Sequence, residues 1–284
     1  MFVILLNMKE ANTIQDDINL KREKSDSIFK KRIHEVDFLR GLLIVLVLVD
    51  HIFWNFYHYN NLWAEHFNYK IDFLNRASKF FNWYWLGDTR AIIREFVLFL
   101  FCFISGVSCA FSRSNWKRGA QMVLVALFVS VFTNLVDSWH VIQQVVRIDF
   151  NIIAVLSWST LIYCFFQEKT YKSLLCVIVG ALIFSLYGIP ILKSIPGSQN
   201  AYVPPLWRPS GQADYIPLFP YIAFFFTGAL FSRFFYQDKK SLFPNPSNIE
   251  KPICFIGRHT MIIYLSHQLF VIPIFLLINL FIMG

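Results

Sequence analysis

Long apolar runs separated by short polar segments dominate the chain. A helix of about 20 apolar residues, rising about 1.5 Å per residue, crosses a bilayer core of about 30 Å. The segments that fit this pattern are 38–57, 95–112, 119–136, 150–166, 173–189, 216–236 and 257–281. We therefore expect an all-α fold, a multi-pass integral membrane helical bundle with about seven transmembrane helices. Residues 35–284 would form this membrane domain, and residues 1–34 a basic tail that is expected to be disordered.

The composition agrees with a membrane protein. Hydrophobic residues make up 56% of the 284 residues and charged residues only 15%, whereas soluble domains carry about 25% charged residues. The net charge of +8 comes without a nucleic-acid-binding motif, so we expect a lipid bilayer and no nucleic acid as partner. With a cytoplasmic N-terminus, most of the 26 lysines and arginines lie on the cytoplasmic side, as the positive-inside rule requires.

The sequence lacks the local motifs of several enzyme classes. Its five cysteines lie singly in or beside apolar runs, which indicates small buried side chains and no disulfide framework. No cluster of His, Cys and Asp has metal-ligand spacing, so no metal is expected, and no glycine-rich phosphate loop or serine nucleophile motif occurs. Any reaction must use histidine, carboxylate and arginine groups from different helices.

The first apolar segment carries ionisable side chains at membrane depth. In a helix over 38–57, His51 lies about 20 Å beyond the start, some two-thirds across the core. Ionisable groups at such depth usually face a bundle interior or a water-filled path. At about 100° per residue, Asp37, Arg40, His51 and His58 fall within roughly 40° of one another. These positions predict a polar stripe along the helix, with His51 as a candidate catalytic residue.

Part of this stripe also has a structural interpretation. Asp37 would stabilise the positive start of the helix, and Arg40 would extend to the lipid head groups. That interpretation accounts less well for His51 than for the other two. Asp50 points about 100° away from the stripe, so we expect it to orient a basic partner and not to pair with His51.

The last apolar segment predicts a second polar face. Thr260, Tyr264, His267 and Gln268 recur at helical spacing, and His267 lies about 15 Å beyond Gly257, near mid-depth. A direct role in the site and an interhelical hydrogen bond that only holds the bundle together are both open for His267.

A compact basic loop precedes the third apolar segment. Its Arg113, Lys117 and Arg118 could bind the phosphates of a nucleotide-containing cofactor, with Arg40 and Arg258 nearby. The same charges also suit ordinary control of membrane topology.

Two segments on the expected outer side, 58–94 and 190–215, are too long to be simple connections. Residues 71–85 place Leu74, Ala77, Phe81 and Trp85 on one face, the pattern of a helix lying in the membrane interface. Residues 190–215 are rich in Pro, Gly and aromatic residues and would form either the lining of a cleft or a rigid loop.

Several of these segments together resemble one family. The matching pieces, in the family's order, are Glu35-Val-Asp37-Phe-Leu-Arg40-Gly41 followed by His51, Phe101-Cys-Phe-Ile-Ser105-Gly106, Phe111-Ser-Arg113-Ser-Asn-Trp-Lys117-Arg118-Gly, Asp214-Tyr-Ile-Pro217-Leu-Phe-Pro220-Tyr221 and Gly257-Arg258-His259-Thr-Met-Ile-Ile-Tyr264-Leu-Ser-His267-Gln268. The chain thereby resembles the bacterial branch of the heparan-α-glucosaminide N-acetyltransferase catalytic-domain family, related to the broader transmembrane acyltransferases. The family often opens its fourth helix with a Phe-Gly-Ile-Leu-His type motif. Here Phe150-Asn151-Ile-Ile-Ala154 lacks both the glycine and the histidine.

The resemblance implies acyl transfer across a membrane, in a bacterial cytoplasmic membrane. Acetyl-CoA would be the cytoplasmic donor, and an amino sugar or hydroxyl of an extracytoplasmic glycan the acceptor. The catalytic candidates are then His51, His267 and Asp50, and the cofactor-binding candidates Arg40, Arg113, Lys117, Arg118 and Arg258. The substrate-binding candidates are His58, Asp214, Tyr264 and Gln268. His51 would act either as general base or as a carrier of the acyl group.

Two other functions fit the same pattern. A transporter or flippase for a glycan or lipid precursor would use the polar stripe as a path. A non-catalytic envelope protein would use its histidines only for packing. The sequence leaves a homo-oligomer open.

Overall fold

The computed structural model describes residues 33–67, 70–139, 147–197, 203–207, 211–237, 240–243 and 247–283, and in these ranges it contains helices and no strands. The α-helices are α2 (His34–His66), α3 (Asp72–Leu86), α4 (Asp88–Ser108), α5 (Asn115–Ser138), α6 (Ile152–Cys164), α7 (Tyr171–Ile183), α8 (Ile189–Ser194), α9 (Tyr221–Phe235), α10 (Glu250–Arg258) and α11 (Thr260–Met283). A short 3-10 turn, Cys109–Phe111, extends α4, and a π-helical turn, Phe184–Gly188, joins α7 to α8. The predicted all-α class is confirmed.

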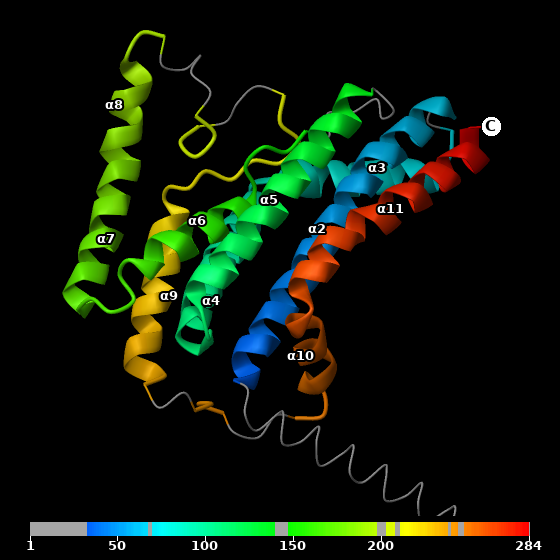
Figure 1. The fold of residues 1–284 in the computed structure, drawn as a ribbon. Helices are drawn as coiled ribbons and strands as arrows, with labels where there is room; N and C mark the ends of the chain where they lie inside the picture. The colour runs from blue at the N-terminus through cyan, green and yellow to red at the C-terminus, as the bar shows by residue number, and fades with distance from the viewer. Residues whose placement is uncertain are drawn as a thin grey trace, which may run out of the picture.

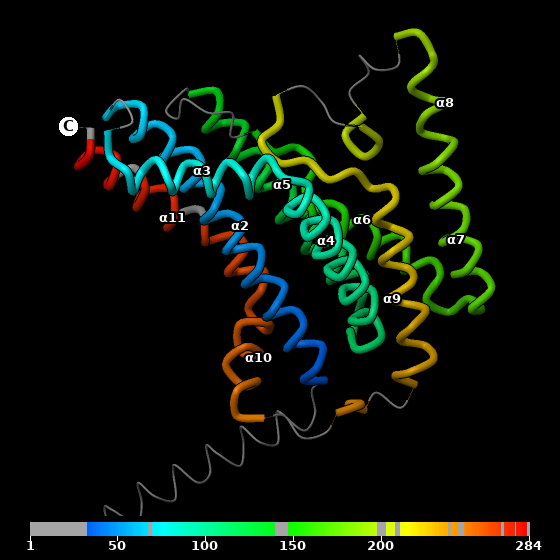
Figure 2. Tube along the Cα trace, turned by 180° about the vertical axis from the view of Figure 1, so that it is seen from behind, coloured from blue at the N-terminus to red at the C-terminus, as the bar shows by residue number. Residues whose placement is uncertain are grey.

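The helices form two groups that meet at α4 (Figure 1). In one group α4 packs on α9, α9 on α7, and α5 on α6. In the other, α2 packs on α10 and α11, which are remote from it in sequence, and also contacts α3 and α4. Figure 2 shows α3 running across the bundle at the end opposite to α10. The contact between α2 and α4 therefore joins the two groups, and α2 reaches from one end of the bundle to the other.

Four described helical segments are long and apolar enough to cross a membrane: Asp88–Phe111, Asn115–Ser138, Tyr171–Ser194 and Thr260–Ile282. They coincide with four of the seven predicted spans and identify an integral membrane protein. The predicted spans 150–166 and 216–236 correspond to the shorter apolar helices α6 and α9. The count of seven and the cytoplasmic N-terminus remain predictions.

The prediction of one continuous helix over 257–281 is wrong at its start. Helix α10 ends at Arg258, and His259, with φ −108° and ψ 17°, separates it from α11. The Thr260 hydroxyl donates to the Gly257 carbonyl at 2.6 Å and satisfies one of the last acceptors of α10. The break lets α10 follow the start of α2 while α11 follows its far half, so both can pack on α2.

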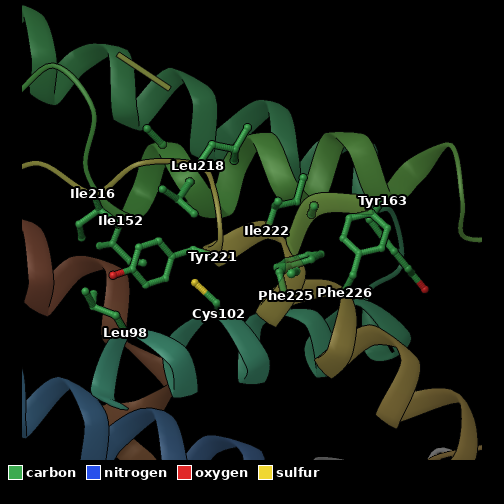
Figure 3. Packing of buried hydrophobic residues seen from close by; sticks show 14 of the residues in the cluster. Leu98, Cys102, Ile152, Tyr163, Ile216, Leu218, Tyr221, Ile222, Phe225 and Phe226 are labelled. Atoms are coloured by element: carbon green, nitrogen blue, oxygen red, sulfur yellow. The ribbon is translucent and has the colours of Figure 1, made fainter. Parts of the chain in front are cut away.

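The largest core cluster joins α4, α6 and α9 (Figure 3). Phe225 and Phe226 of α9 and Cys102 of α4 have no exposed side-chain surface. All five cysteines are free, and four are buried, as predicted, whereas Cys176 on α7 is exposed. The prediction of a buried side chain is wrong for Cys176 because the outer face of α7 has no helix against it in this part of the chain.

Residues 71–86 form the predicted amphipathic helix. In α3 the side chains of Leu74, Ala77 and Phe81 are half-buried toward α2, whereas Arg76 and Lys79 are exposed. The buried Asn60 of α2 fixes this packing, because its amide donates to the Ser78 hydroxyl at 2.6 Å and to the Leu74 carbonyl at 3.0 Å. The helix therefore lies on α2 along the side of Leu74, Ala77 and Phe81, whereas Phe73, Trp83 and Leu86 are exposed.

Candidate active site

A cavity of about 490 Å³ lies between α2, α4, α5, α6 and the start of α11. Its walls are mainly apolar, with a few charged and polar side chains among them. The charged and histidine side chains that line it are Arg40, Asp50, His51, Arg94, Arg118, Asp214 and Arg258. Ligand sites of this kind combine an apolar wall with a few placed polar groups, so this cavity is the candidate active site.

Three arginines from three helices meet at one end of the cavity. Arg118, one turn into α5, donates to the Ser105 hydroxyl of α4 at 2.9 Å. Arg40 of α2 donates to the Ser108 hydroxyl, also on α4. Arg258 ends α10. Because guanidinium groups bind phosphate oxygens in a bidentate manner, this arginine end suits a phosphate-containing ligand.

The Asp37 carboxylate organises two of these arginines. It lies 3.7 Å from the Arg40 guanidinium on its own helix and 3.4 Å from that of Arg258 on α10. The backbones of α2 and α10 come close here, since a Cβ on Gly41 would overlap the Ile253 carbonyl and one on Gly257 would overlap that of Asp37. Glycine at these two positions therefore allows the Asp-x-x-Arg-Gly segment of α2 and the end of α10 to pack this closely.

Glu35, two residues earlier, has a different role. Its carboxylate accepts the backbone N–H of Leu242 at 2.7 Å and the hydroxyl of Tyr236 at 3.2 Å. Glu35 therefore connects the start of α2 to the chain after α9 and does not face the cavity.

His51 lines the cavity next to a second histidine. The ring centroids of His51 and His267 are 4.7 Å apart, with an interplanar angle of 69°. His267 is 8% exposed, and its Nδ1 lies 2.6 Å from the Tyr264 carbonyl oxygen. Two histidines from helices more than 200 residues apart in sequence therefore form a pair, of which His51 lines the cavity.

Asp50 has its own set of partners. Its two carboxylate oxygens accept from Nε and Nη2 of Arg90, each at 2.8 Å, and one also accepts from the Tyr84 hydroxyl at 2.9 Å. The Arg90 guanidinium lies 3.5 Å from the centre of the Trp85 ring. Burial and the neighbouring Asp50 carboxylate raise the pKa of Tyr84 to about 12. The basic partner that Asp50 was expected to orient is Arg90.

A further charged pair lines the cavity on this side. The guanidinium of Arg94 lies 3.7 Å from the Asp214 carboxylate, and both side chains are 32% exposed. Asp214 belongs to the segment 211–216, whose backbone bonds to 147–150 through Ala213 N–H to the Arg147 carbonyl at 2.8 Å. The segment 190–215 was expected to form either a cleft lining or a rigid loop. Its described part around Asp214 does the first and is fixed by these bonds.

The structure brings together most, but not all, of the sequence-predicted site residues. Arg40, Asp50, His51, Arg118, Asp214, Arg258 and Tyr264 all line the cavity, and His267 lies against His51. Arg113 and Lys117 are exposed and are not among the lining residues. His58 stacks on Trp54, with ring centroids 6.3 Å apart, also away from the cavity lining. The side chain of Gln268 lies outside the described residues.

Sequence reasoning missed Arg90, Arg94 and Tyr84. The spacing of Arg90 and Arg94, one helical turn apart and directly before an apolar run, was an available signal. The predicted span 95–112 starts after both arginines, whereas α4 starts at Asp88 and includes them.

Asn151 stands where the family's fourth-helix motif often has glycine, and the structure shows a local role for it. Asn151 caps α6 by accepting the backbone N–H groups of Ile153 and Ala154 at 3.1 and 3.2 Å.

Within the part of the chain that the structure describes, no three His, Cys, Asp or Glu side chains form a group able to hold a metal ion.

Comparison with known proteins gives one match. The family model described as "Heparan-alpha-glucosaminide N-acetyltransferase, catalytic" matches residues 32–269, which is most of the chain. No curated protein and no solved structure matches the chain. The matched range contains the arginine end, the histidine pair and Asp214.

Proposed function

Because the chain belongs to the family of heparan-α-glucosaminide N-acetyltransferase catalytic domains, we propose that it transfers an acetyl group from acetyl-CoA to an amine or hydroxyl of a glycan on the other side of the membrane. Membership implies an acyltransferase-type enzyme, and the four long apolar helices identify a membrane protein. The donor, the acceptor and the direction of transfer form the proposal.

The observation that carries this proposal is the cavity itself. It contains three arginines at one end, His51 farther along α2, and the Arg94–Asp214 pair. Arg40 and His51 are eleven residues apart on one helix, a rise of about 16 Å. A coenzyme A molecule carries phosphates at one end and its thioester at the end of a long arm. The arrangement supports phosphates at the arginines and the thioester at His51.

His51 would promote the transfer in one of two ways. As a general base it takes the proton of the acceptor N–H or O–H while the acceptor attacks the thioester carbonyl. The C–S bond then breaks, and the coenzyme A thiolate takes up a proton. As a nucleophile, the imidazole would itself form the new bond to the acyl carbon, release the thiolate and pass the acyl group to the acceptor. In both routes the products are the acylated acceptor and free thiol.

The remaining candidates have supporting places in this proposal. Arg113 and Lys117 would attract the donor from outside the cavity by charge alone, because neither lines it. Asp214 and Tyr264 would contact the acceptor from the cavity wall. His58 and Gln268 complete the proposed acceptor set, and Asp50 would hold Arg90 beside His51.

Release of coenzyme A thiol by the purified protein tests the function. We expect release from acetyl-CoA to depend on an added amino sugar, and His51→Ala to lower its rate at least about 100-fold. His66→Ala is the matched control, since His66 is an exposed histidine at the end of the same helix. Equal rates for wild type and His51→Ala would contradict the role of His51.

The same assay distinguishes the alternatives. A transporter would move a glycan precursor across vesicles without releasing thiol. A non-catalytic envelope protein would release none with any acceptor and would tolerate His51→Ala as long as it folds. Either result would overturn the acyltransferase proposal.

A further inference from the structure

We propose that His267 is a positioning residue for His51: its unprotonated Nε2 accepts a ring N–H of His51 and thereby fixes which nitrogen of His51 presents a lone pair to the cavity. This inference rests on the proposed function, and it explains why one particular ring nitrogen of His51 is unprotonated and can react.

The tautomer of His267 follows from its own hydrogen bond. Its Nδ1 lies 2.6 Å from the Tyr264 carbonyl oxygen, three residues earlier in α11. A carbonyl oxygen only accepts hydrogen bonds, so Nδ1 must carry the proton. In the neutral ring Nε2 is then an acceptor.

That acceptor is buried, and the ring of His51 packs against the same imidazole. Nε2 of His267 has no hydrogen-bond partner among the described residues, although the side chain is only 8% exposed. A buried acceptor without a partner is costly, and such atoms are rare in folded proteins. The His51 ring lies 4.7 Å away, centre to centre, at 69°. In the proposed arrangement an N–H of His51 donates to this lone pair.

The consequence concerns the chemistry of His51. If one of its nitrogens donates to His267, the other is unprotonated and available to the cavity, as both a base and a nucleophile require. When His51 takes the proton of the acceptor, its bond to His267 becomes a charge-assisted hydrogen bond and stabilises the imidazolium.

The neighbouring carboxylate of Asp50 already has other donors. Both oxygens of Asp50 accept from Arg90 at 2.8 Å, and Tyr84 donates to one of them. Asp50 also points to a different side of α2 from His51, because adjacent helical residues differ by about 100°. Of these two neighbours of His51, His267 has the buried acceptor that lacks a partner among the described residues.

Two substitutions at one position separate positioning from packing. His267→Leu keeps an apolar filling but removes the acceptor, and we expect kcat for thiol release to fall about 100-fold or more, with KM for acetyl-CoA changed by less than about twofold. His267→Gln restores an acceptor oxygen and should recover kcat to within about tenfold of wild type. His66→Leu serves as the control. Equal kcat values for His267→Leu and wild type, or equal losses in the Leu and Gln variants, would overturn the proposal.

A spectroscopic measurement tests the same point without turnover. With ¹⁵N-labelled histidine, His51 of the wild type should show one neutral tautomer, and His267→Leu should show a mixture of two. A mixture already present in the wild type would contradict the proposal. If the wild type releases no thiol at all, the proposed function fails first. If His51→Ala abolishes release and His267→Leu does not, only this inference fails.

Discussion

Asp50 and His51 are neighbours in the sequence, yet their side chains have different surroundings. His51 lines the cavity beside His267, whereas Asp50 binds Arg90 and Tyr84. Helical geometry separates them, since adjacent side chains point about 100° apart. The pair therefore combines two functions on one turn of α2: a group available to a ligand, and a group that attaches α2 to the end of α3 and the start of α4.

The ion pair of Asp50 gives a stability prediction. Its side chain and that of Arg90 are 22% and 18% exposed, and the two nitrogen–oxygen bonds are both 2.8 Å. We expect Asp50→Asn to destabilise the protein by about 1–3 kcal/mol, because the guanidinium then lacks its charged partner. Thermal unfolding in detergent measures this change.

A double-mutant cycle tests whether the loss comes from the pair itself. Asp50→Asn combined with Arg90→Gln should be less destabilising than the sum of the two single changes, by about 0.5–3 kcal/mol. Strict additivity would show that Asp50 and Arg90 contribute independently and would refute the pairing.

The contribution of the Tyr84–Asp50 hydrogen bond to the free energy of unfolding should not vary between pH 6 and 9, because the pKa of Tyr84 is raised to about 12. The raised pKa places any loss of that bond above pH 10.

At the level of the elements, the contact between α2 and α10 determines where Arg258 lies. The backbones approach so closely that neither Gly41 nor Gly257 has room for a Cβ. Small residues at such a crossing allow close packing of helices in membranes. Because Arg258 follows Gly257 directly, the same crossing places its guanidinium near Asp37 and at the cavity.

Alanine substitutions at two glycines test this crossing. Gly41→Ala should destabilise the protein by about 1–3 kcal/mol, since the added methyl group meets the Ile253 carbonyl. Gly180→Ala on α7 is the matched control. A Cβ there meets nothing within 4 Å, and alanine favours the helix by up to about 1 kcal/mol. Equal unfolding temperatures for the two variants would mean that α10 does not approach α2 in this way.

The helices were the most predictable part of this fold. Apolar runs of the right length indicated α4, α5, α7 and α11, and the face of Leu74, Ala77 and Phe81 indicated α3. Their ends were less predictable. Gly257 lies two residues before the break at His259 but is itself helical, and the break depends on α10 and α11 packing on different parts of α2. Such choices are made by tertiary contacts that local sequence does not encode.

For the whole molecule, the sequence predicts which types of residue belong to the site, but it does not predict which residues contact one another. The depth of His51 and His267 identified both as candidates, but nothing in sequence spacing shows that they lie 4.7 Å apart. The partners of Asp50 lie 34 and 40 residues away on other helices. The sequence of a basic loop does not show which of its side chains enter a cavity. Arg118 lines the cavity because α5 packs so that it reaches Ser105, whereas Arg113 and Lys117 do not line it.

The orientation of the whole molecule in the membrane is testable with two new cysteines. Arg76 on α3 and Lys172 at the start of α7 are exposed. Helix α3 and the start of α7 lie at opposite ends of the bundle (Figure 1). With a cytoplasmic N-terminus and seven spans, Arg76→Cys should react with an impermeant maleimide on intact cells, and Lys172→Cys only after lysis. Replacing the exposed Cys176 by serine leaves four buried native thiols, which keeps the background low. The reverse pattern would invert the orientation, and labelling of both cysteines from one side would refute the predicted number of spans between them.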